Sequence, residues 1–156
     1  MKLRAWMMVG VGLLWVGAAM AQEAKTKAAA KADIASMTAN ELKWSEVPGT
    51  GGVMSAPLWG DMSKGAYGAM FKFPAGKAMP LHTHSSDYKL VVVSGTFLYG
   101  AGEEPQKKYG PGSFLTTGKD VKHTSGCEAS GPCVFFMEQP GKFDMKPVGE
   151  KAPAKK

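Results

Sequence analysis

The stretch GKAMPLHTHSSDYKLVVVSG, residues 76–95, carries two of the chain's three histidines and a long run of strand-forming residues. His82 and His84 lie two positions apart, and residues two apart in a β-strand point to the same face of the sheet. The run from Tyr88 is rich in Val, Leu and aromatic residues, which favour strands, until a Ser-Gly pair interrupts it. The stretch therefore predicts a strand with two imidazoles on one face, followed by another strand.

Short strands separated by turn signals continue along the chain. Its 156 residues include 20 Gly and 10 Pro, and clusters of Gly, Pro and Asp divide the apolar runs. The expected strands cover 66–73, 88–98, 113–117, 121–126, 133–138 and 143–147. Regular short strands of this kind are typical of an all-β sandwich or barrel. A helix is expected only near 28–43, where Ala, Lys and Glu dominate, and 101–108 is expected to be an exposed connection.

The third histidine, His123, lies 39 residues after His84, in a strand-like segment that follows a turn. Three converging neutral imidazoles suit a divalent first-row metal ion, and Zn, Fe, Mn, Ni and Cu all accept imidazole ligands. With three protein ligands, one coordination position stays open for water or substrate, as catalytic metal sites require. We predict that His82, His84 and His123 bind one divalent metal ion.

The spacing of these residues also matches a known motif. Gly76, His82, His84 and Gly95 follow the pattern of the first cupin motif, G-x5-H-x-H-x3-E-x6-G, with Tyr88 in place of the Glu. The chain therefore resembles the cupin superfamily. The resemblance implies an antiparallel β-barrel or jelly roll of six to eight strands, with a metal site inside it.

A second segment, from Pro111 through His123, resembles the second cupin motif, whose His completes the metal site. Gly118 and Asp120 stand where this motif usually has Pro and Gly. More narrowly, residues 57–147 resemble a little-characterised group of exported bacterial single-domain cupins, through PLWGD, PLHTH, VVVSGT, GPGS and CVFF…GKFD. That group is similar to the cupin-like domain of zinc-binding anti-sigma factors, and the resemblance implies a homodimer.

Tyr88 occupies the position of the missing Glu. It has the same strand parity as His82 and His84, so a regular strand turns it inward, whereas Asp87 faces away. An inward phenol can donate a hydrogen bond to a bound ligand, pack, or ligate the metal as a phenolate. Because phenol ionises only near pH 10 unless a metal lowers its pKa, we expect packing or hydrogen bonding beside the metal ligands or substrate.

The first 21 residues have the features of a secretory signal. Lys2 and Arg4 precede an uncharged run of 17 residues, 5–21, which ends in the small-x-small pattern Ala-Met-Ala. We expect cleavage after Ala21, which gives a periplasmic or secreted protein with no stable membrane insertion. A membrane anchor is the alternative, because 17 uncharged residues are close to the shortest helix that can span a bilayer. The expected parts are a signal peptide (1–21), an Ala/Lys-rich segment (22–40), the cupin barrel (41–147) and a Lys-rich flexible tail (148–156).

The charge pattern argues against nucleic acid as a partner. Loss of Lys2 and Arg4 lowers the formal net charge from +6 to +4 and leaves no Arg in the chain. Residues 34–145 hold ten Lys and ten acidic residues, so the positive excess lies in the tails. Without Arg there is no bidentate fork for phosphates or bases, nor a clamp for a dicarboxylate such as 2-oxoglutarate.

The two cysteines, Cys127 and Cys133, flank a turn-rich Glu-Ala-Ser-Gly-Pro spacer. Two residues that face each other across a hairpin can meet the distance requirement of a disulfide, and an exported protein tolerates one. We therefore predict a Cys127–Cys133 disulfide, with two reduced thiols as the alternative.

Two main functions are compatible with this sequence. The first is a mononuclear metalloenzyme, of dioxygenase type or with Lewis-acid chemistry, that acts on a small molecule through the three-histidine site. The second is a non-catalytic, sensor-like cupin that binds a metal or a ligand. A structural cupin with a vestigial site is a third alternative.

Overall fold

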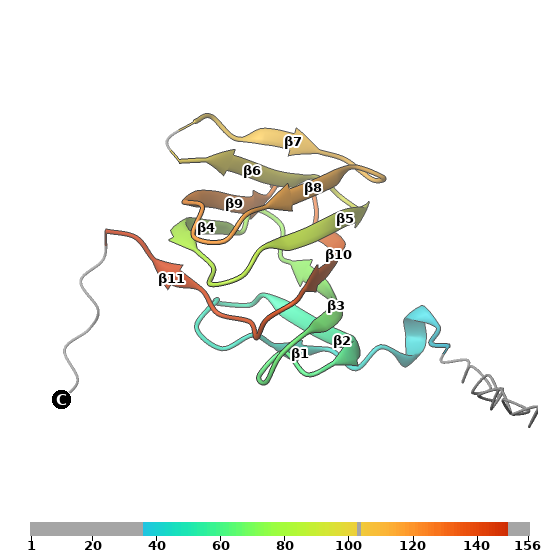
Figure 1. Cartoon of the computed structure of the whole chain (residues 1–156). Helices are drawn as coiled ribbons and strands as arrows, with labels where there is room; N and C mark the ends of the chain where they lie inside the picture. The colour runs from blue at the N-terminus through green and yellow to red at the C-terminus, as the bar shows by residue number, and fades with distance from the viewer. Residues whose placement is uncertain (1–35, 103, 150–156) are drawn as a thin grey trace, which may run out of the picture. The chain divides into compact units, whose positions relative to one another are not determined.

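In the computed structural model, which describes residues 36–102 and 104–149, eleven β-strands form two antiparallel sheets (Figure 1). From β3 to β6, and again from β8 to β11, each strand lies in the opposite sheet from the strand before it. This alternation between two sheets is the chain path of a jelly roll. The all-β fold predicted from the sequence is confirmed.

The larger sheet has six strands in the order β1-β2-β3-β10-β5-β8, and the smaller has five in the order β11-β4-β9-β6-β7. The six strands are β1 (Ser45–Glu46), β2 (Met54–Gly60), β3 (Tyr67–Phe73), β10 (Cys133–Gln139), β5 (Tyr88–Ser94) and β8 (Phe114–Thr117). The five are β11 (Lys146–Pro147), β4 (Ala78–Thr83), β9 (His123–Cys127), β6 (Phe97–Ala101) and β7 (Lys107–Tyr109).

The hydrophobic core lies between the two sheets. Along β10 buried residues alternate with half-buried ones, because successive side chains of a strand point to opposite faces. Phe135 of β10 is at the centre, with ring centroids 5.6 Å from Phe71 and 5.3 Å from Phe73 of the same sheet. Phe97 of the other sheet lies 4.8 Å from Phe135. These aromatic contacts join the sheets around one core.

Phe114 differs from the phenylalanines of the core. It is 59% exposed at the start of the edge strand β8. The register of β8 turns Phe114 to the outer face, opposite Val91 of β5.

The turn between β5 and β6 explains the Ser-Gly interruption. Gly95 has φ +72°, in the left-handed region that favours glycine. A Cβ added there would lie 2.4 Å from the carbonyl oxygen of Pro132 and 2.7 Å from Cα of Cys133. The turn therefore requires a residue without a side chain, and it brings β5 and β6 into opposite sheets.

Some local predictions differ from the structure. The expected exposed connection 101–108 includes the start of β7, a short edge strand with two exposed lysines that pairs with β6. Strand β2 was not predicted; it contains a proline and a register shift near Pro57. Within the described part of 28–43, the expected helix is only a 3-10 turn at Ala39–Glu41.

The expected signal peptide, its cleavage site, most of the Ala/Lys-rich segment and most of the Lys-rich tail lie outside the described residues. Among the residues that are described, none belongs to a helix long and apolar enough to cross a membrane.

Candidate metal centre

His82 and His123 face each other across the pair of neighbouring strands β4 and β9. The two residues are register partners, beyond a shift in the pairing that begins after Met79. Their ring centroids are 4.2 Å apart, and the side chains are almost fully buried. A pair of imidazoles separated by 41 positions in sequence is thus brought together by strand pairing.

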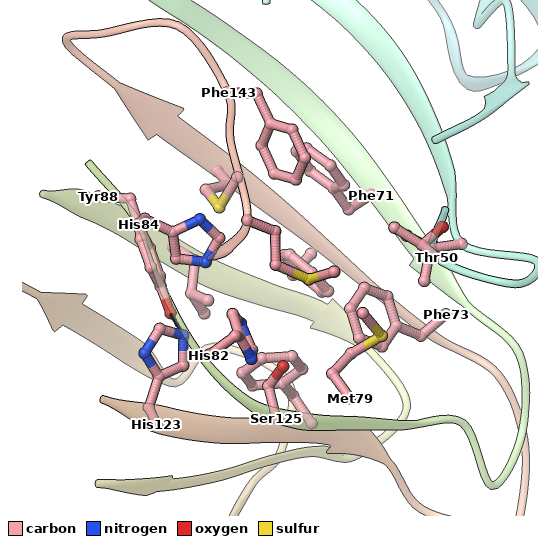
Figure 2. Close-up of a pocket in the computed structure, with 16 residues that line it drawn as sticks. Thr50, Phe71, Phe73, Met79, His82, His84, Tyr88, His123, Ser125 and Phe143 are labelled. Carbon is pink, nitrogen blue, oxygen red and sulfur yellow. Dashed lines mark hydrogen bonds between the residues drawn. The ribbon is translucent and has the colours of Figure 1, made fainter. Parts of the chain in front are cut away.

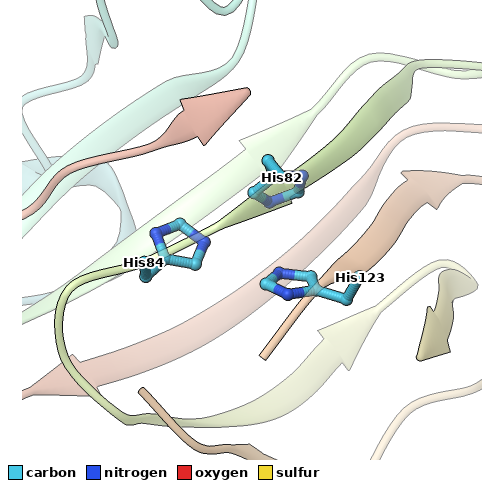
Figure 3. A group of neighbouring side chains, drawn as sticks. All are labelled: His82, His84 and His123. Atoms are coloured by element: carbon cyan, nitrogen blue, oxygen red, sulfur yellow. The ribbon is translucent and has the colours of Figure 1, made fainter. Parts of the chain in front are cut away.

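His84 completes the cluster from the position just after β4. Its ring centroid lies 5.0 Å from that of His82 and 5.3 Å from that of His123. One nitrogen from each of the three rings lies within 4.8 Å of the other two (Figure 3). The structure therefore brings together the three residues that the sequence predicted as metal ligands.

The hydrogen bonds of the three rings determine which nitrogen is available. Nδ1 of His82 lies 2.6 Å from the carbonyl oxygen of Pro80, and Nδ1 of His123 lies 2.9 Å from that of Val121. Nδ1 of His84 contacts the carbonyl oxygen of Asp144. A carbonyl only accepts hydrogen bonds, so each Nδ1 carries the proton and each Nε2 keeps a lone pair.

Burial keeps these rings neutral. Desolvation lowers the pKa of His82 and of His84 below the ordinary value, and it lowers the pKa of His123 to about 4. The backbone acceptors oppose this effect without overcoming it. Neutral imidazole is the form that binds a metal ion, so the cluster is in its ligating state near pH 7.

Tyr88 lies inside, and the neighbouring Asp87 is exposed, as strand parity predicted. The Tyr88 hydroxyl lies 3.2 Å from Nε2 of His123. Since that nitrogen holds a lone pair, the hydroxyl donates to it. Burial raises the pKa of Tyr88 well above its usual range, so the phenol retains its proton. Tyr88 therefore acts as a hydrogen-bond donor at the edge of the histidine cluster.

The histidines and Tyr88 lie at one side of a pocket between the sheets (Figure 2). The cavity has a volume of about 50 Å³. Its apolar lining consists of Val53, Phe71, Phe73, Met79, Leu90, Phe97, Phe135, Met137, Phe143 and Met145. Ser125 and Thr50 add hydroxyl groups, and that of Thr50 donates to the carbonyl oxygen of Val47 at 2.6 Å.

Several of these residues could not be identified from the sequence as part of the site. Ser125 follows His123 by two positions on β9 and so shares its face, but a lone serine in a strand carries no signal of its own. Asp144 and Phe143 come from the connection between β10 and β11. Asp144 reaches His84 through its main-chain carbonyl, a group that every residue has.

The residues present fit a metal ion. Three neutral imidazoles with unprotonated Nε2 atoms converge in a buried position, and each ring is oriented through its other nitrogen. The Nε2 of His123 accepts a hydrogen bond from Tyr88, which a metal ion would replace. Metal-binding histidines in proteins are generally held in this way. The arrangement can hold a divalent ion while leaving coordination positions toward the pocket.

The cysteines are not among the residues that line the pocket. Cys127 ends β9 and Cys133 begins β10, and both are buried. Both are free thiols in this structure, and Sγ of Cys127 lies 3.3 Å from the carbonyl oxygen of Gly131. The disulfide stays a prediction.

Comparison with known proteins gives a family and a fold. A family model described as a domain of unknown function, DUF4437, matches residues 5–146. No curated protein matches the chain.

Three solved structures illustrate the similarity in fold. The polyketide cyclase RemF from Streptomyces resistomycificus superposes with a TM-score of 0.66 at 16% identity, over 76% of this chain and 88% of that one. An RmlC-like cupin with a double-stranded β-helix fold from Methanocaldococcus jannaschii gives 0.50 at 16%, over 64% and 89%. The Rhodobacter sphaeroides complex of SigE with the anti-sigma ChrR gives 0.51 at 21%, over 65% of this chain and half of that one. At these identities the similarity shows the cupin fold alone.

Proposed function

Because the chain belongs to the DUF4437 family, whose description names no activity, we propose from its own residues that it is a metal-binding cupin with a pocket for a small ligand that has an apolar body. One observation carries the proposal. All three Nδ1 atoms are bound by backbone carbonyls, so three Nε2 lone pairs converge at one side of an apolar pocket. His82, His84 and His123 are the proposed ligands of one divalent ion, of which Zn, Fe, Mn, Ni and Cu are candidates.

The lining of the pocket supports a ligand with an apolar body. With the histidines neutral, none of the described residues around the pocket carries a formal charge. A charge on the body of the ligand would lose its hydration without gaining a counter-charge from these residues, which is costly in an apolar site. Only the divalent ion could offset an anionic group, and only at the atom that binds it. A molecule with one oxygen or nitrogen donor and an apolar body therefore fits the pattern.

In the first form of the proposal, the protein is an enzyme that uses the bound metal ion. A bound divalent ion supplies Lewis acidity, or redox chemistry if it is iron or copper. Tyr88 offers a hydroxyl donor beside the ion site and Ser125 a second hydroxyl, so together they can orient one polar group of a ligand. The phenylalanines and methionines of the pocket exclude water from the rest of the ligand.

A sensor-like binding module is the second form. The small cavity favours it, since about 50 Å³ accommodates only a few water-sized groups. The likeness to the anti-sigma complex supports the fold of this alternative and nothing more.

Export and assembly stay predictions. The expected signal peptide supports periplasmic or secreted localisation, and N-terminal sequencing of the native protein tests cleavage after Ala21. The cupin resemblance supports a homodimer, which light scattering tests. We propose no nucleic-acid partner, because residues 34–145 have no net charge.

The metal centre is tested with protein that is purified without affinity metals and titrated with Zn²⁺, Co²⁺, Fe²⁺ and Cu²⁺. We expect one equivalent bound by wild type and none by the His123→Ala variant, whose circular dichroism should remain that of a folded β-protein. Equal binding by the two proteins would contradict the assignment. A screen of aromatic and aliphatic alcohols against the loaded protein then tests the ligand class, with glycerol, which has hydroxyl groups but no apolar body, as the control.

A further inference from the structure

The three histidines differ in what orients them. His82 and His123 each bond through Nδ1 to a carbonyl two residues earlier in the chain. His84 bonds instead to the carbonyl oxygen of Asp144, sixty residues later. His84 is therefore the one proposed ligand whose ring orientation depends on a distant segment.

That segment also lines the pocket. We call residues 140–148 the strap; it leaves β10 and includes the two-residue strand β11, which pairs with β4 (Figure 1). Phe143 and Met145 of the strap line the cavity, and the Phe143 ring lies 5.8 Å from His84 and 6.1 Å from Phe71 between centroids. The same stretch of chain thus forms part of the pocket wall and, through Asp144, orients a proposed ligand of the metal centre.

The strap is attached by a few identifiable contacts. The Asp144 carboxylate accepts hydrogen bonds from the Ser85 backbone N–H at 2.8 Å and from the Ser85 hydroxyl. The Phe143 N–H donates to the carbonyl of Met62 at 2.8 Å, and the Val148 N–H donates to that of Leu81 at 2.9 Å. Ser85 directly follows His84. Asp144 is therefore hydrogen-bonded to two consecutive residues, through its main-chain carbonyl to His84 and through its carboxylate to Ser85.

The cavity is small while the strap is in place. Its volume is about 50 Å³, whereas a cavity of about 150 Å³ is known to admit benzene. A ligand of ring size that lies wholly inside the pocket therefore needs the strap to move, and moving it withdraws the Asp144 carbonyl from His84.

We propose that Asp144 is a positioning residue that couples closure of the strap to metal binding. This inference rests on the proposed metal centre. With the strap closed, the Asp144 carbonyl holds the His84 ring with Nε2 toward the other two histidines. With the strap open, the ring loses that partner and the centre loses an oriented ligand. Because coupling between two equilibria is reciprocal, a bound metal ion stabilises the closed strap to the same degree.

Metal affinity tests the coupling. Asp144→Ala keeps the main-chain carbonyl that orients His84 but removes the carboxylate that fastens this carbonyl in place through Ser85. Loss of an outer partner of a metal-binding histidine generally weakens binding by about 10–100-fold, and we expect the low end of that range, about 10-fold, because only the fastening is lost. The affinity for Zn²⁺ is measured by competition with a chromophoric chelator, and the visible spectrum of the Co²⁺ form should change. Asp144→Asn retains an acceptor oxygen for Ser85 and should recover most of the loss.

Glu128→Ala is the matched control. Glu128 is a partly exposed carboxylate that contacts Lys108 and Ser130 at the far end of β9, away from the strap. Its removal should leave both the Zn²⁺ affinity and the Co²⁺ spectrum unchanged. Wild-type affinity in Asp144→Ala would overturn the proposed coupling.

Hydrogen exchange of wild-type protein provides a readout that needs no variant. Zn²⁺ should slow exchange of the Phe143 and Val148 amides, which hold the strap to the barrel, more than that of edge amides in β7. Equal exchange with and without bound Zn²⁺ would also overturn the coupling. If wild type bound no metal at all, the metal centre itself would fail, and the coupling with it.

Discussion

At the scale of single residues, the lone pair on Nε2 of His123 has two possible partners, the Tyr88 hydroxyl and a metal ion. Nε2 of His123 accepts a hydrogen bond from Tyr88, and the same lone pair is the one that a metal ion needs. Metal binding therefore displaces the Tyr88 hydroxyl from His123. The displaced hydroxyl remains at the edge of the centre, where it can donate to a ligand.

The variant Tyr88→Phe separates a hydrogen-bonding role from ligation. Removing the hydroxyl removes a hydrogen bond worth about 1 kcal/mol that competes with the metal, so Zn²⁺ affinity should stay the same or rise by up to about fivefold. Tyr67→Phe is the control, because the hydroxyl of Tyr67 is 3.4 Å from Gln139. A loss of affinity confined to Tyr88→Phe would instead identify Tyr88 as a ligand.

Which site residues could be predicted depended on how they act. The histidines and Tyr88 act through side chains whose spacing and parity are visible in the sequence. Asp144 acts on His84 through a main-chain carbonyl, and the importance of Ser125 depends on the face that β9 presents to the pocket. Contacts of these two kinds depend on how distant strands pair, which local patterns do not reveal.

At the scale of secondary-structure elements, the motif glycines and their substitutes have a structural explanation. Asp120, where the second cupin motif usually has Gly, has φ +58°. Its N–H donates to the carbonyl oxygen of His84 at 2.9 Å. Asp is among the few residues that tolerate this left-handed conformation, so the substitution keeps the turn that leads into β9.

Gly95 does not allow such a substitution. Gly95→Ala places a Cβ against the Pro132 carbonyl, whereas Gly112→Ala, at φ +82°, meets no atom within 4 Å. Both variants bear the backbone penalty of about 1–2 kcal/mol, but only Gly95→Ala adds an overpacking cost of about 1–3 kcal/mol. Urea unfolding should show Gly95→Ala as the less stable variant. Equal stabilities would contradict the tight β5–β6 turn.

The elements that were predicted correctly are those with strong apolar alternation, such as β3 and β10, where one face packs into the core. Strand β7 was not predicted, because its exposed lysines give no apolar pattern. The strand forms because it pairs with β6. Strand β2 was missed because Pro57 and the register shift break the expected pattern.

At the scale of the whole molecule, burial of the histidines should make stability depend on pH. The pKa of His123 falls to about 4 in the folded protein, while an unfolded histidine titrates near 6.5. Between these values the unfolded chain binds more protons, so stability is complete above about pH 6.5 and falls as the pH drops toward 4. His82 and His84, whose pKa values are also lowered, add to the same trend.

Denaturant unfolding of the metal-free protein at pH values from 4 to 8 measures this effect. His123 contributes at most about 3 kcal/mol to the free energy of unfolding. In the variant His123→Gln, the slope of this free energy against pH should correspond to about one proton fewer taken up on unfolding in that window. A slope that is unchanged in His123→Gln would show that His123 is not a neutral buried residue.

The most direct test of the account is the metal content of the protein when metal is offered under chelator-buffered conditions, compared between wild type and the His123→Ala variant. We predict one equivalent of a divalent ion in wild type, and none in a variant that remains folded. Wild-type protein that takes up no metal, or a variant that binds as much as wild type, would contradict a metal centre formed by His82, His84 and His123.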